Sequence, residues 1–271
     1  MNASSWLKQA AREVDLLDAE LILARTINKE RLFLHAHPDY LLDQKERKIA
    51  NARLARRIKK EPLAYILGTK DFYGRTFKVT PATLIPRPET EELIEYIKSA
   101  SATSFTNNQP VRIIDVGTGS GCIAITLALE LPNAQVTAVD ISEDALDCAK
   151  YNACQHGVSN ISMKKSDLLQ NTQLSGQKFN FIVANLPYVD PEWEWLDKDT
   201  LAYEPQTALY ASDHGLALIK ELIISAPYYL AKNGQLVLEA DQSQHQAIID
   251  FAAQTTALKP IAQTGLALVL R

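Results

Sequence analysis

Cysteine is scarce in this sequence, which contains Cys122, Cys148 and Cys154 and no other. An odd number without a Cys-x-x-Cys spacing argues against a disulfide framework and against a structural zinc site. We therefore interpret all three as reduced packing residues. Histidine is also scarce, and the closest pair, His35 and His37, stands two residues apart, which does not place both rings on one helix face. The sequence predicts no metal site.

The sequence also lacks a long apolar run. No stretch reaches the roughly 18 consecutive apolar residues that a membrane-spanning helix needs. The first residues turn polar too soon to form the apolar centre of a signal peptide. We therefore expect a globular, cytoplasmic protein that does not enter a membrane.

An excess of positive charge is absent as well. The net charge of −4 gives no general electrostatic footprint for a nucleic-acid backbone, although a local basic patch stays possible. We expect no direct contact with nucleic acid. The length of 271 residues exceeds the commonest size of one domain, so a larger domain with a smaller one is expected.

Residues 1–60 are predicted to form a small helical domain. Their apolar residues recur at helical spacing, and Pro38 with Asp39 marks a break between helices. The last predicted helix carries five basic residues, for which a solvated face is favoured over a partner-binding patch. These are Arg53, Arg56, Arg57, Lys59 and Lys60.

Residues 61–83 change character and predict a hairpin-like linker. Aromatic and β-branched residues alternate around glycines in Tyr65-Ile-Leu-Gly68 and again from Phe72 to Val79. A Pro-Arg87-Pro-Glu-Thr-Glu segment follows at the start of the third predicted part, residues 84–271. Prolines followed by Thr and Glu are typical of a helix N-terminus.

Beyond about residue 109 the pattern alternates strands with helices, which predicts an α/β fold with a mostly parallel sheet covered on both faces. The expected strands are 111–116, 135–140, 161–164, 179–184 and 234–239, with two closing strands within 258–270. The expected helices are 121–131, 143–155 and one near 214–231.

The first of these strands runs into a glycine loop with the order Gly-x-Gly-x-Gly. The loop consists of Asp115, Val116, Gly117, Thr118, Gly119, Ser120 and Gly121. A dinucleotide-binding loop needs its third glycine at position 122, which is a cysteine, and the lysine of a Walker loop is also absent. The anionic Asp115 disfavours pyrophosphate and favours the ammonium of a methionine moiety. The loop therefore favours S-adenosylmethionine as the cofactor.

Two further aspartates follow later strands. Asp140 ends the second strand about 20 residues after the loop, where a carboxylate binds ribose hydroxyls. Asp167 follows the third strand and is a candidate for the adenine amino group, with Leu168 against the ring. For Asp167, an ordinary loop or helix-capping role is as well supported by the sequence.

The fourth strand ends in Asn185-Leu186-Pro187-Tyr188, a turn suited to holding an amide or amine nitrogen. The Asn185 oxygen and the Leu186 carbonyl can accept the two N–H bonds of a substrate amide, which orients its nitrogen. Pro187 restricts Leu186 to extended conformations, and Tyr188 can pack on the planar amide. A single such turn is usually structural; its place after the fourth strand favours the catalytic interpretation.

Taken together, these motifs resemble the peptide-chain release factor glutamine methyltransferases, the PrmC or HemK family. The resemblance covers nearly the whole chain and includes Glu61-Pro-Leu-Ala-Tyr-Ile-Leu-Gly68, Ile85-Pro-Arg-Pro-Glu-Thr-Glu91, the glycine loop, the catalytic turn and Tyr203-Glu-Pro-Gln-Thr-Ala-Leu209. It implies a Rossmann-like class I S-adenosylmethionine-dependent methyltransferase with a small N-terminal helical domain that recognises the substrate.

The resemblance also implies the reaction and its residues. The reaction is methylation of the side-chain nitrogen (N5) of the glutamine in the Gly-Gly-Gln (GGQ) motif of class I release factors, which supports translation termination. Asn185 would contact both cofactor and substrate, and Arg87 the substrate. Leu186 stands where the family usually has a second proline, but its backbone carbonyl survives that change.

Three alternatives remain at this point. A glutamine methyltransferase acting on a ribosomal protein shares the chemistry, and the Pro-Arg-Pro-Glu-Thr-Glu segment argues against it. An adenine-N6 nucleic-acid methyltransferase shares the turn but should carry a basic cleft or a recognition domain. A homologue that binds the cofactor without catalysis is the third.

Overall fold

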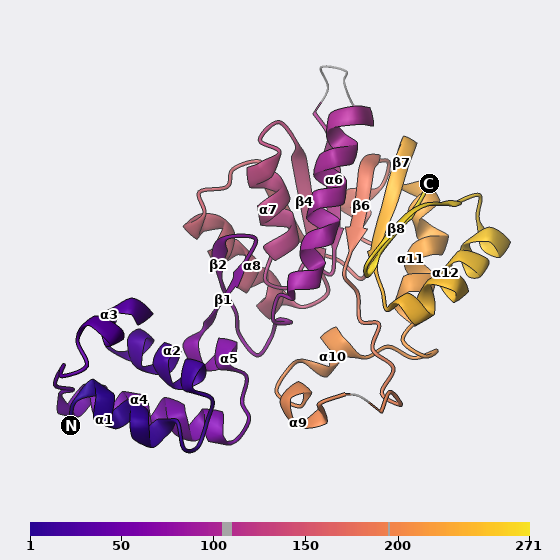
Figure 1. Cartoon of the computed structure of the whole chain (residues 1–271). Coiled ribbons are helices and arrows are strands. Elements are labelled where there is room, and N and C mark those ends of the chain that lie inside the picture. Colours follow the sequence, from indigo (N-terminus) through magenta and orange to yellow (C-terminus); the bar gives the residue numbers. More distant parts are fainter. Residues whose placement is uncertain (105–109, 195) are drawn as a thin grey trace. The chain divides into compact units, whose positions relative to one another are not determined.

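The computed structural model describes residues 1–104, 110–194 and 196–271, and the chain divides into two compact units (Figure 1). One unit comprises Met1–Thr69 and Asp197–Tyr203, and the other comprises Lys70–Leu196 and Glu204–Arg271. A short segment from late in the sequence therefore belongs with the N-terminal residues. The sequence-based division into 1–60, 61–83 and 84–271 stays a proposal.

The first unit is helical and has its own core. Its helices are α1 (Ala3–Ala10), α2 (Leu16–Thr26), α3 (Arg31–Ala36), α4 (Gln44–Ile58), α5 (Leu63–Leu67) and α9 (Lys198–Leu201). Asn2, Asp15 and Asp43 precede α1, α2 and α4, and each side chain accepts a hydrogen bond from a backbone N–H of the first turn. Trp6 and Leu23 are among the buried residues that these helices enclose.

Part of the basic run at the end of α4 is paired within this unit. Arg57 forms a salt bridge with Asp18, in which the Nε···Oδ2 distance is 2.5 Å, and Arg56 pairs with Glu61. Ion pairs of this partly exposed kind contribute little to stability. Arg56 and Arg57, which the sequence analysis assigned to a solvated basic face, therefore form ion pairs within the unit.

The hairpin predicted within residues 61–83 is wrong in its first half. Tyr65, Ile66 and Leu67 lie in the helix α5, which Gly68 ends with a left-handed φ of 75°. Tyr65 and Ile66 are buried, and this burial outweighs the strand preference of the local sequence. The hairpin is confined to β1 (Thr69–Phe72) and β2 (Arg75–Lys78).

The second unit is built on a seven-stranded sheet with the order β5-β4-β3-β6-β7-β9-β8. The strands are β3 (Arg112–Val116), β4 (Gln135–Asp140), β5 (Ile161–Lys165), β6 (Phe179–Ala184), β7 (Leu230–Glu239), β8 (Pro260–Thr264) and β9 (Ala267–Leu270). The first five strands of that order are parallel to one another, and β9 is antiparallel to both of its neighbours, β7 and β8. The two predicted closing strands are confirmed.

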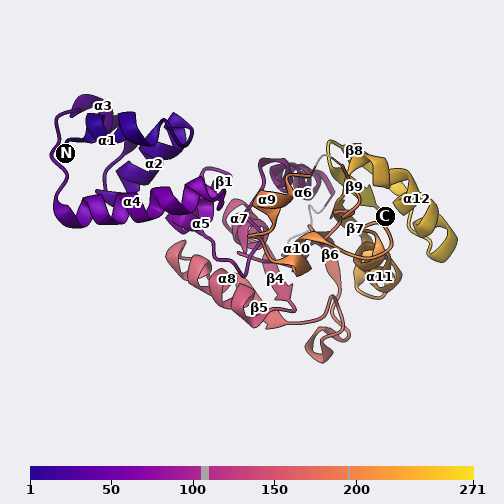
Figure 2. The ribbon, with the colours of Figure 1, turned by 90° about the horizontal axis from the view of Figure 1, so that it is seen from below.

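Helices cover both faces of this sheet. The helices α6 (Glu91–Ser104), α7 (Cys122–Glu130) and α8 (Glu143–Gln155) contribute to one core cluster, and α11 (Ala217–Ser225) and α12 (Gln242–Thr255) to the other. Alternate residues of β3 separate accordingly, with Ile113 in the first cluster and Ile114 in the second. Figure 2 shows α11 and α12 together, apart from α6 and α7. The predicted α/β fold is confirmed.

Short helical segments complete the second unit: η1 (Pro88–Thr90), η2 (Thr172–Leu174), α10 (Gln206–Leu209) and η3 (Ala226–Tyr228). The helix expected near 214–231 is shorter than predicted, because α11 ends at Ser225 and a 3₁₀ turn that contains Pro227 follows at Ala226. The strand expected at 234–239 instead begins at Leu230.

The packing role predicted for the cysteines applies to two of them. Cys122 and Cys148 are buried free thiols, whereas Cys154 is exposed. Burial raises the pKa of the Cys122 thiol to about 12, which leaves it protonated at neutral pH. Among the described helices, none combines the length and apolar character that crossing a membrane requires.

Candidate active site

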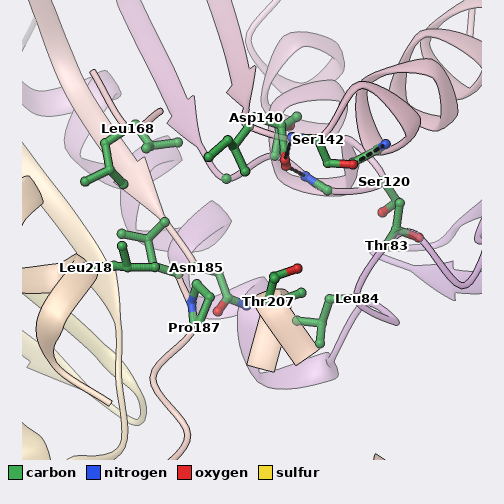
Figure 3. A pocket seen from close by; sticks show the side chains of 18 of the residues that line it. Thr83, Leu84, Ser120, Asp140, Ser142, Leu168, Asn185, Pro187, Thr207 and Leu218 are labelled. Carbon is green, nitrogen blue, oxygen red and sulfur yellow. Dashed lines mark hydrogen bonds between the residues drawn. The ribbon is translucent and has the colours of Figure 1, made fainter. Parts of the chain in front are cut away.

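A cavity of about 420 Å³ opens where β3, β4, β5 and β6 end. Figure 3 shows Asp140 and Leu168 on one side of it and Asn185, Pro187 and Thr207 on the other. The segments that line it contribute residues 82–84, 86, 90, 116–120, 122–123, 140–142, 145, 166–168, 185–187, 207–208, 210–212 and 217–218. The order of the strands in the sheet reverses between β3 and β6. Open α/β sheets bind ligands at the carboxyl ends of the strands at such a point.

The glycine loop forms one wall of the cavity. Gly117, Gly119 and Gly121 have φ values of 77°, 55° and 82°, a left-handed conformation that favours glycine. A Cβ on Gly117 would lie 3.0 Å from the Leu186 side chain, and one on Gly121 would lie 2.8 Å from Ile125. Glycine is therefore suited to these positions for two reasons. It adopts the left-handed backbone, and it leaves room for Leu186 of the turn and Ile125 of α7.

Asp115 shapes this loop from beneath and does not line the cavity. It is fully buried, and its Oδ2 accepts hydrogen bonds from the Thr118 hydroxyl at 2.6 Å and the Ala124 N–H at 3.2 Å. Burial raises its pKa to about 7, against the lowering effect of these two hydrogen bonds. Its Oδ1 has no hydrogen-bond partner among the described residues.

Asp140 lines the cavity at the end of β4. Its Oδ2 accepts the Gly119 N–H at 2.8 Å and its Oδ1 accepts the Ser142 N–H at 2.9 Å. Burial raises its pKa, and these backbone donors oppose the rise. A carboxylate has further lone pairs, so it can still accept bonds from hydroxyl groups in the cavity.

Asp167 and Leu168 line the same part of the cavity. Leu168 is buried and has a φ of 43°, an unusual conformation for a residue with a side chain. Ile141, which the sequence reasoning did not single out, also lines the cavity although 61% of its surface is exposed. Leu168 and Ile141 give this end of the cavity an apolar character suited to a flat ring.

The Asn185-Leu186-Pro187-Tyr188 turn follows β6 directly. The Asn185 Nδ2 donates to the Thr90 hydroxyl oxygen at 3.1 Å, and the Tyr188 hydroxyl donates to Glu239 Oε1 at 3.1 Å. Asn185, Leu186 and Pro187 line the cavity, whereas Tyr188 does not. Burial and the neighbouring Glu239 raise the pKa of Tyr188, so its hydroxyl stays protonated and acts as a donor.

Comparison with known proteins identifies the family of this chain. A family model described as a methyltransferase domain matches residues 107–261, and one described as the PrmC N-terminal domain matches residues 1–68. The release factor glutamine methyltransferase of Coxiella burnetii is 40% identical over 233 residues, which are 86% of this chain and 81% of that protein. The Escherichia coli protein of the same name is 37% identical over 253 residues, covering 92% and 89%. The chain belongs to the release factor glutamine methyltransferases.

The solved structures show the fold alone. The hMettl16 catalytic domain, in complex with MAT2A 3'UTR hairpin 1, has a TM-score of 0.56 and 16% sequence identity, and the match covers 86% of this chain and 81% of that one. This likeness confirms the methyltransferase fold. The enzyme is a protein-glutamine methyltransferase whose cofactor is S-adenosylmethionine.

The cavity of this glutamine methyltransferase fits its cofactor. Its volume lies within the roughly 300–1,000 Å³ of small-molecule sites. Its described lining includes the carboxylates Asp140 and Asp167 and no lysine or arginine. Such a lining suits a cationic ligand with sulfonium and ammonium groups, and it does not suit a polyphosphate.

Arg87 lies outside the cavity lining of this methyltransferase. Its guanidinium pairs with Glu204, whose Oε2 also accepts the Ile85 N–H at 3.0 Å. Glu204 is buried, and its ion pair with Arg87 anchors the segment before η1. A role for Arg87 in substrate binding stays a prediction.

Two residues beside the Asn185–Tyr188 turn were not predicted from the sequence. Thr90 stands in the Pro-Arg-Pro-Glu-Thr-Glu segment and contacts Asn185, so the sequence signal was present but was assigned to the arginine. Glu239 ends β7, the strand beside β6. That neighbour relation depends on the sheet order, which the strand pattern alone does not give.

A metal-ligand group exists outside the cavity. Among the described residues, Asp190, Glu192 and His214 have ligand atoms within 4.8 Å of one another. His214 Nδ1 lies 2.9 Å from Asp190 Oδ2, so a hydrogen bond accounts for that proximity, and Glu192 and His214 are exposed. We assign no ion to this group.

Proposed function

We propose that the enzyme transfers the methyl group of S-adenosylmethionine to the N5 atom of the glutamine in the Gly-Gly-Gln motif of class I peptide-chain release factors, supporting translation termination. The observation that carries the proposal is the orientation of Asn185 beside the cavity. Its Nδ2 is engaged by Thr90, so its Oδ1 is the atom available to accept a hydrogen bond from a substrate.

The chemistry follows from the weakness of an amide nitrogen as a nucleophile, whose lone pair is delocalised into its carbonyl. Bound S-adenosylmethionine supplies an electrophilic methyl group. In the proposed mechanism, Asn185 Oδ1 and the Leu186 carbonyl oxygen accept the two N–H bonds of the glutamine amide and orient its nitrogen. Both acceptors also face the positive charge that develops on that nitrogen during transfer. The nitrogen then loses one of its two N–H protons to solvent, which leaves a neutral N-methyl amide.

The remaining sequence predictions are also part of the proposal. Pro187 lines the cavity together with Asn185, and the Tyr188 hydroxyl donates to Glu239. We propose that the Tyr188 ring supports the planar amide of the substrate. The loop residues Gly117, Thr118, Gly119 and Ser120 line the part of the cavity assigned to the cofactor. The N-terminal helical unit is proposed to bind the body of the release factor.

The relatives' name favours a release factor over the other substrates considered. Curated relatives covering most of this chain are named release factor glutamine methyltransferases. A ribosomal protein glutamine and a nucleic-acid adenine present a planar nitrogen to the same turn, so the substrate assay has to include them.

The test is mass spectrometry of a full-length class I release factor incubated with the enzyme and S-adenosylmethionine. We expect one added methyl group on the glutamine of the Gly-Gly-Gln motif, and none when that glutamine is replaced by alanine. Cofactor binding without methylation of the release factor, together with methylation of a ribosomal protein or of adenine in the same assay, would contradict the proposed substrate.

A further inference from the structure

A buried carboxylate lies directly behind the catalytic turn. Glu239 is the last residue of β7 and only 1% exposed. The parallel register pairs Ala184 of β6 with Leu238 of β7, so the next residues, Asn185 and Glu239, stand side by side at the same edge of the sheet. No lysine or arginine among the described residues forms a salt bridge with Glu239.

Glu239 belongs to a chain of polar contacts that includes both ends of the turn. Its Oε1 accepts the Tyr188 hydroxyl at 3.1 Å, while Thr90 and Asn185 face the same carboxylate and favour its ionised form. Thr90 in turn accepts the Asn185 Nδ2–H at 3.1 Å. Glu239 Oε2 is buried and forms no hydrogen bond of ordinary geometry with a described residue.

A carboxylate without a cationic partner is costly to bury. A structural role would normally give Glu239 a lysine or arginine, as Glu204 has in Arg87. An unneutralised carboxylate beside a substrate-binding turn is instead typical of a functional site. A role of the negative charge in the reaction would explain why the free-energy cost of burying this carboxylate is tolerated.

We propose that Glu239 is a positioning residue for methyl transfer, which holds Tyr188 directly and Asn185 through Thr90, and whose negative charge strengthens the Asn185 and Leu186 acceptors. The inference rests on the proposed function of the turn. Thr90 accepts a hydrogen bond from Asn185 Nδ2 and favours the ionised form of Glu239, so it links the two residues. With Nδ2 engaged in this way, Asn185 Oδ1 is the atom left for the substrate.

The charge of Glu239 gives the proposal a pH dependence. Burial raises the pKa of Glu239 to about 7, hydrogen bonding from Thr90, Tyr188 and Asn185 opposes the rise, and the nearby Glu89 adds to it. Below this pKa the carboxylate is protonated and neutral, so it no longer stabilises the positive charge that develops on the reacting nitrogen. The kcat for methylation should therefore rise as the pH rises through about 7.

Asp115 must be distinguished from Glu239, because its pKa is also raised to about 7. Asp115 contacts the glycine loop and not the catalytic turn. Its titration should change the Kd of S-adenosylmethionine, and saturation with the cofactor should remove that effect. The assay therefore measures kcat at saturating cofactor and saturating release factor.

The decisive experiment compares wild-type enzyme with Glu239→Gln between pH 6 and pH 9, using a full-length class I release factor. We expect Glu239→Gln to lower kcat at pH 8 by about 10–100-fold, the range of supporting interactions around a site, and to lose the acid limb of the pH profile. The Kd of S-adenosylmethionine should change less than about twofold. Glu221→Gln removes an exposed carboxylate on α11 and should behave as wild type.

Substitution of Thr90 tests the same contact chain while the Glu239 side chain stays in place. Thr90→Val keeps the side-chain shape and removes the hydroxyl, so kcat should fall with the KM for the release factor less affected, whereas Thr90→Ser should restore most activity. An unchanged acid limb in Glu239→Gln, or equal activities of the two Thr90 variants, would overturn the inference. Absence of methylation by the wild-type enzyme would instead refute the proposed function.

Discussion

Asn185 is the residue on which the proposed chemistry depends most directly. Replacing it with alanine removes the Oδ1 acceptor and the Thr90 contact but leaves β6 and its buried side chains in place. We expect Asn185→Ala to lower kcat by about 10²–10³-fold, the usual cost of losing one donor or acceptor aimed at developing charge. The measurement is release factor methylation under saturating conditions.

Thermal unfolding is the control for this variant. The melting temperature of Asn185→Ala should stay within a few degrees of the wild-type value, because the removed side chain is only partly buried. Near-normal turnover in a folded variant would rule out the acceptor role of Asn185.

Asp140 provides the corresponding test of the cofactor site. Its carboxylate accepts two backbone N–H bonds and faces the cavity. Since a charge-assisted hydrogen bond contributes about 1.5–3 kcal/mol, Asp140→Ala should weaken S-adenosylmethionine binding by about 10–100-fold. Saturated turnover should fall much less. Isothermal titration calorimetry gives the Kd, and an unchanged value would exclude the proposed ribose contact.

At the scale of elements, the loop before α11, which includes His214 and Gly215, packs against the Asn185–Tyr188 turn. Gln244 of α12 donates to the Tyr188 carbonyl at 2.8 Å and to the His214 carbonyl at 2.9 Å. Gly215, with a φ of 82°, leaves so little room that a Cβ there would lie 2.0 Å from the Tyr188 oxygen. The loop, the turn and α12 thus meet through one buried amide.

This contact predicts that Gly215→Ala displaces the turn. The substitution should cost about 1–3 kcal/mol of stability and lower kcat, because the left-handed backbone and the clash with Tyr188 act together. Gly176→Ala is the matched control, since Gly176 has a φ of 73° but nothing within 4 Å of an added Cβ. If both variants retain the same activity, the loop does not position the turn.

Other elements show how far local pattern determines structure. The helix at 143–155 and the strands at 135–140 and 179–184 have the predicted limits, because clear capping or turn residues and a consistent period mark them. Tyr65-Ile-Leu was predicted as part of a hairpin and is helical. Its aromatic and β-branched residues favour a strand locally, and burial against the N-terminal core overrides that preference.

At the scale of the whole molecule, the site belongs to one unit. Every described residue lining the cavity lies in the unit Lys70–Leu196 with Glu204–Arg271. A ligand stabilises the structure that binds it, by about 2.7 kcal/mol at a free concentration of 100 times Kd. We therefore expect S-adenosylmethionine to slow amide hydrogen exchange in β3, β4 and β6 and to leave α1, α2 and α4 nearly unchanged. Equal protection of both units would contradict this expectation.

The sequence by itself determined the order of strands and helices and the class of cofactor, and it proposed the residues that hold that cofactor. These features are local: a glycine loop after a strand, an aspartate at a strand end and an Asn-Leu-Pro-Tyr turn each occupy a few consecutive residues. Their chemistry can be inferred before the fold is known, because the carboxyl ends of parallel strands lie at one edge of a sheet.

Only the tertiary structure decided which side chains support that site. Thr90 and Glu239 stand 95 and 54 positions from Asn185 in the numbering, and they reach it because η1 lies against the turn and β7 pairs in register with β6. The pairing of Arg87 with Glu204, and not with the cavity, depends on similarly distant chain segments. Sheet register and long-range packing set these contacts, and no local pattern in the sequence encodes them.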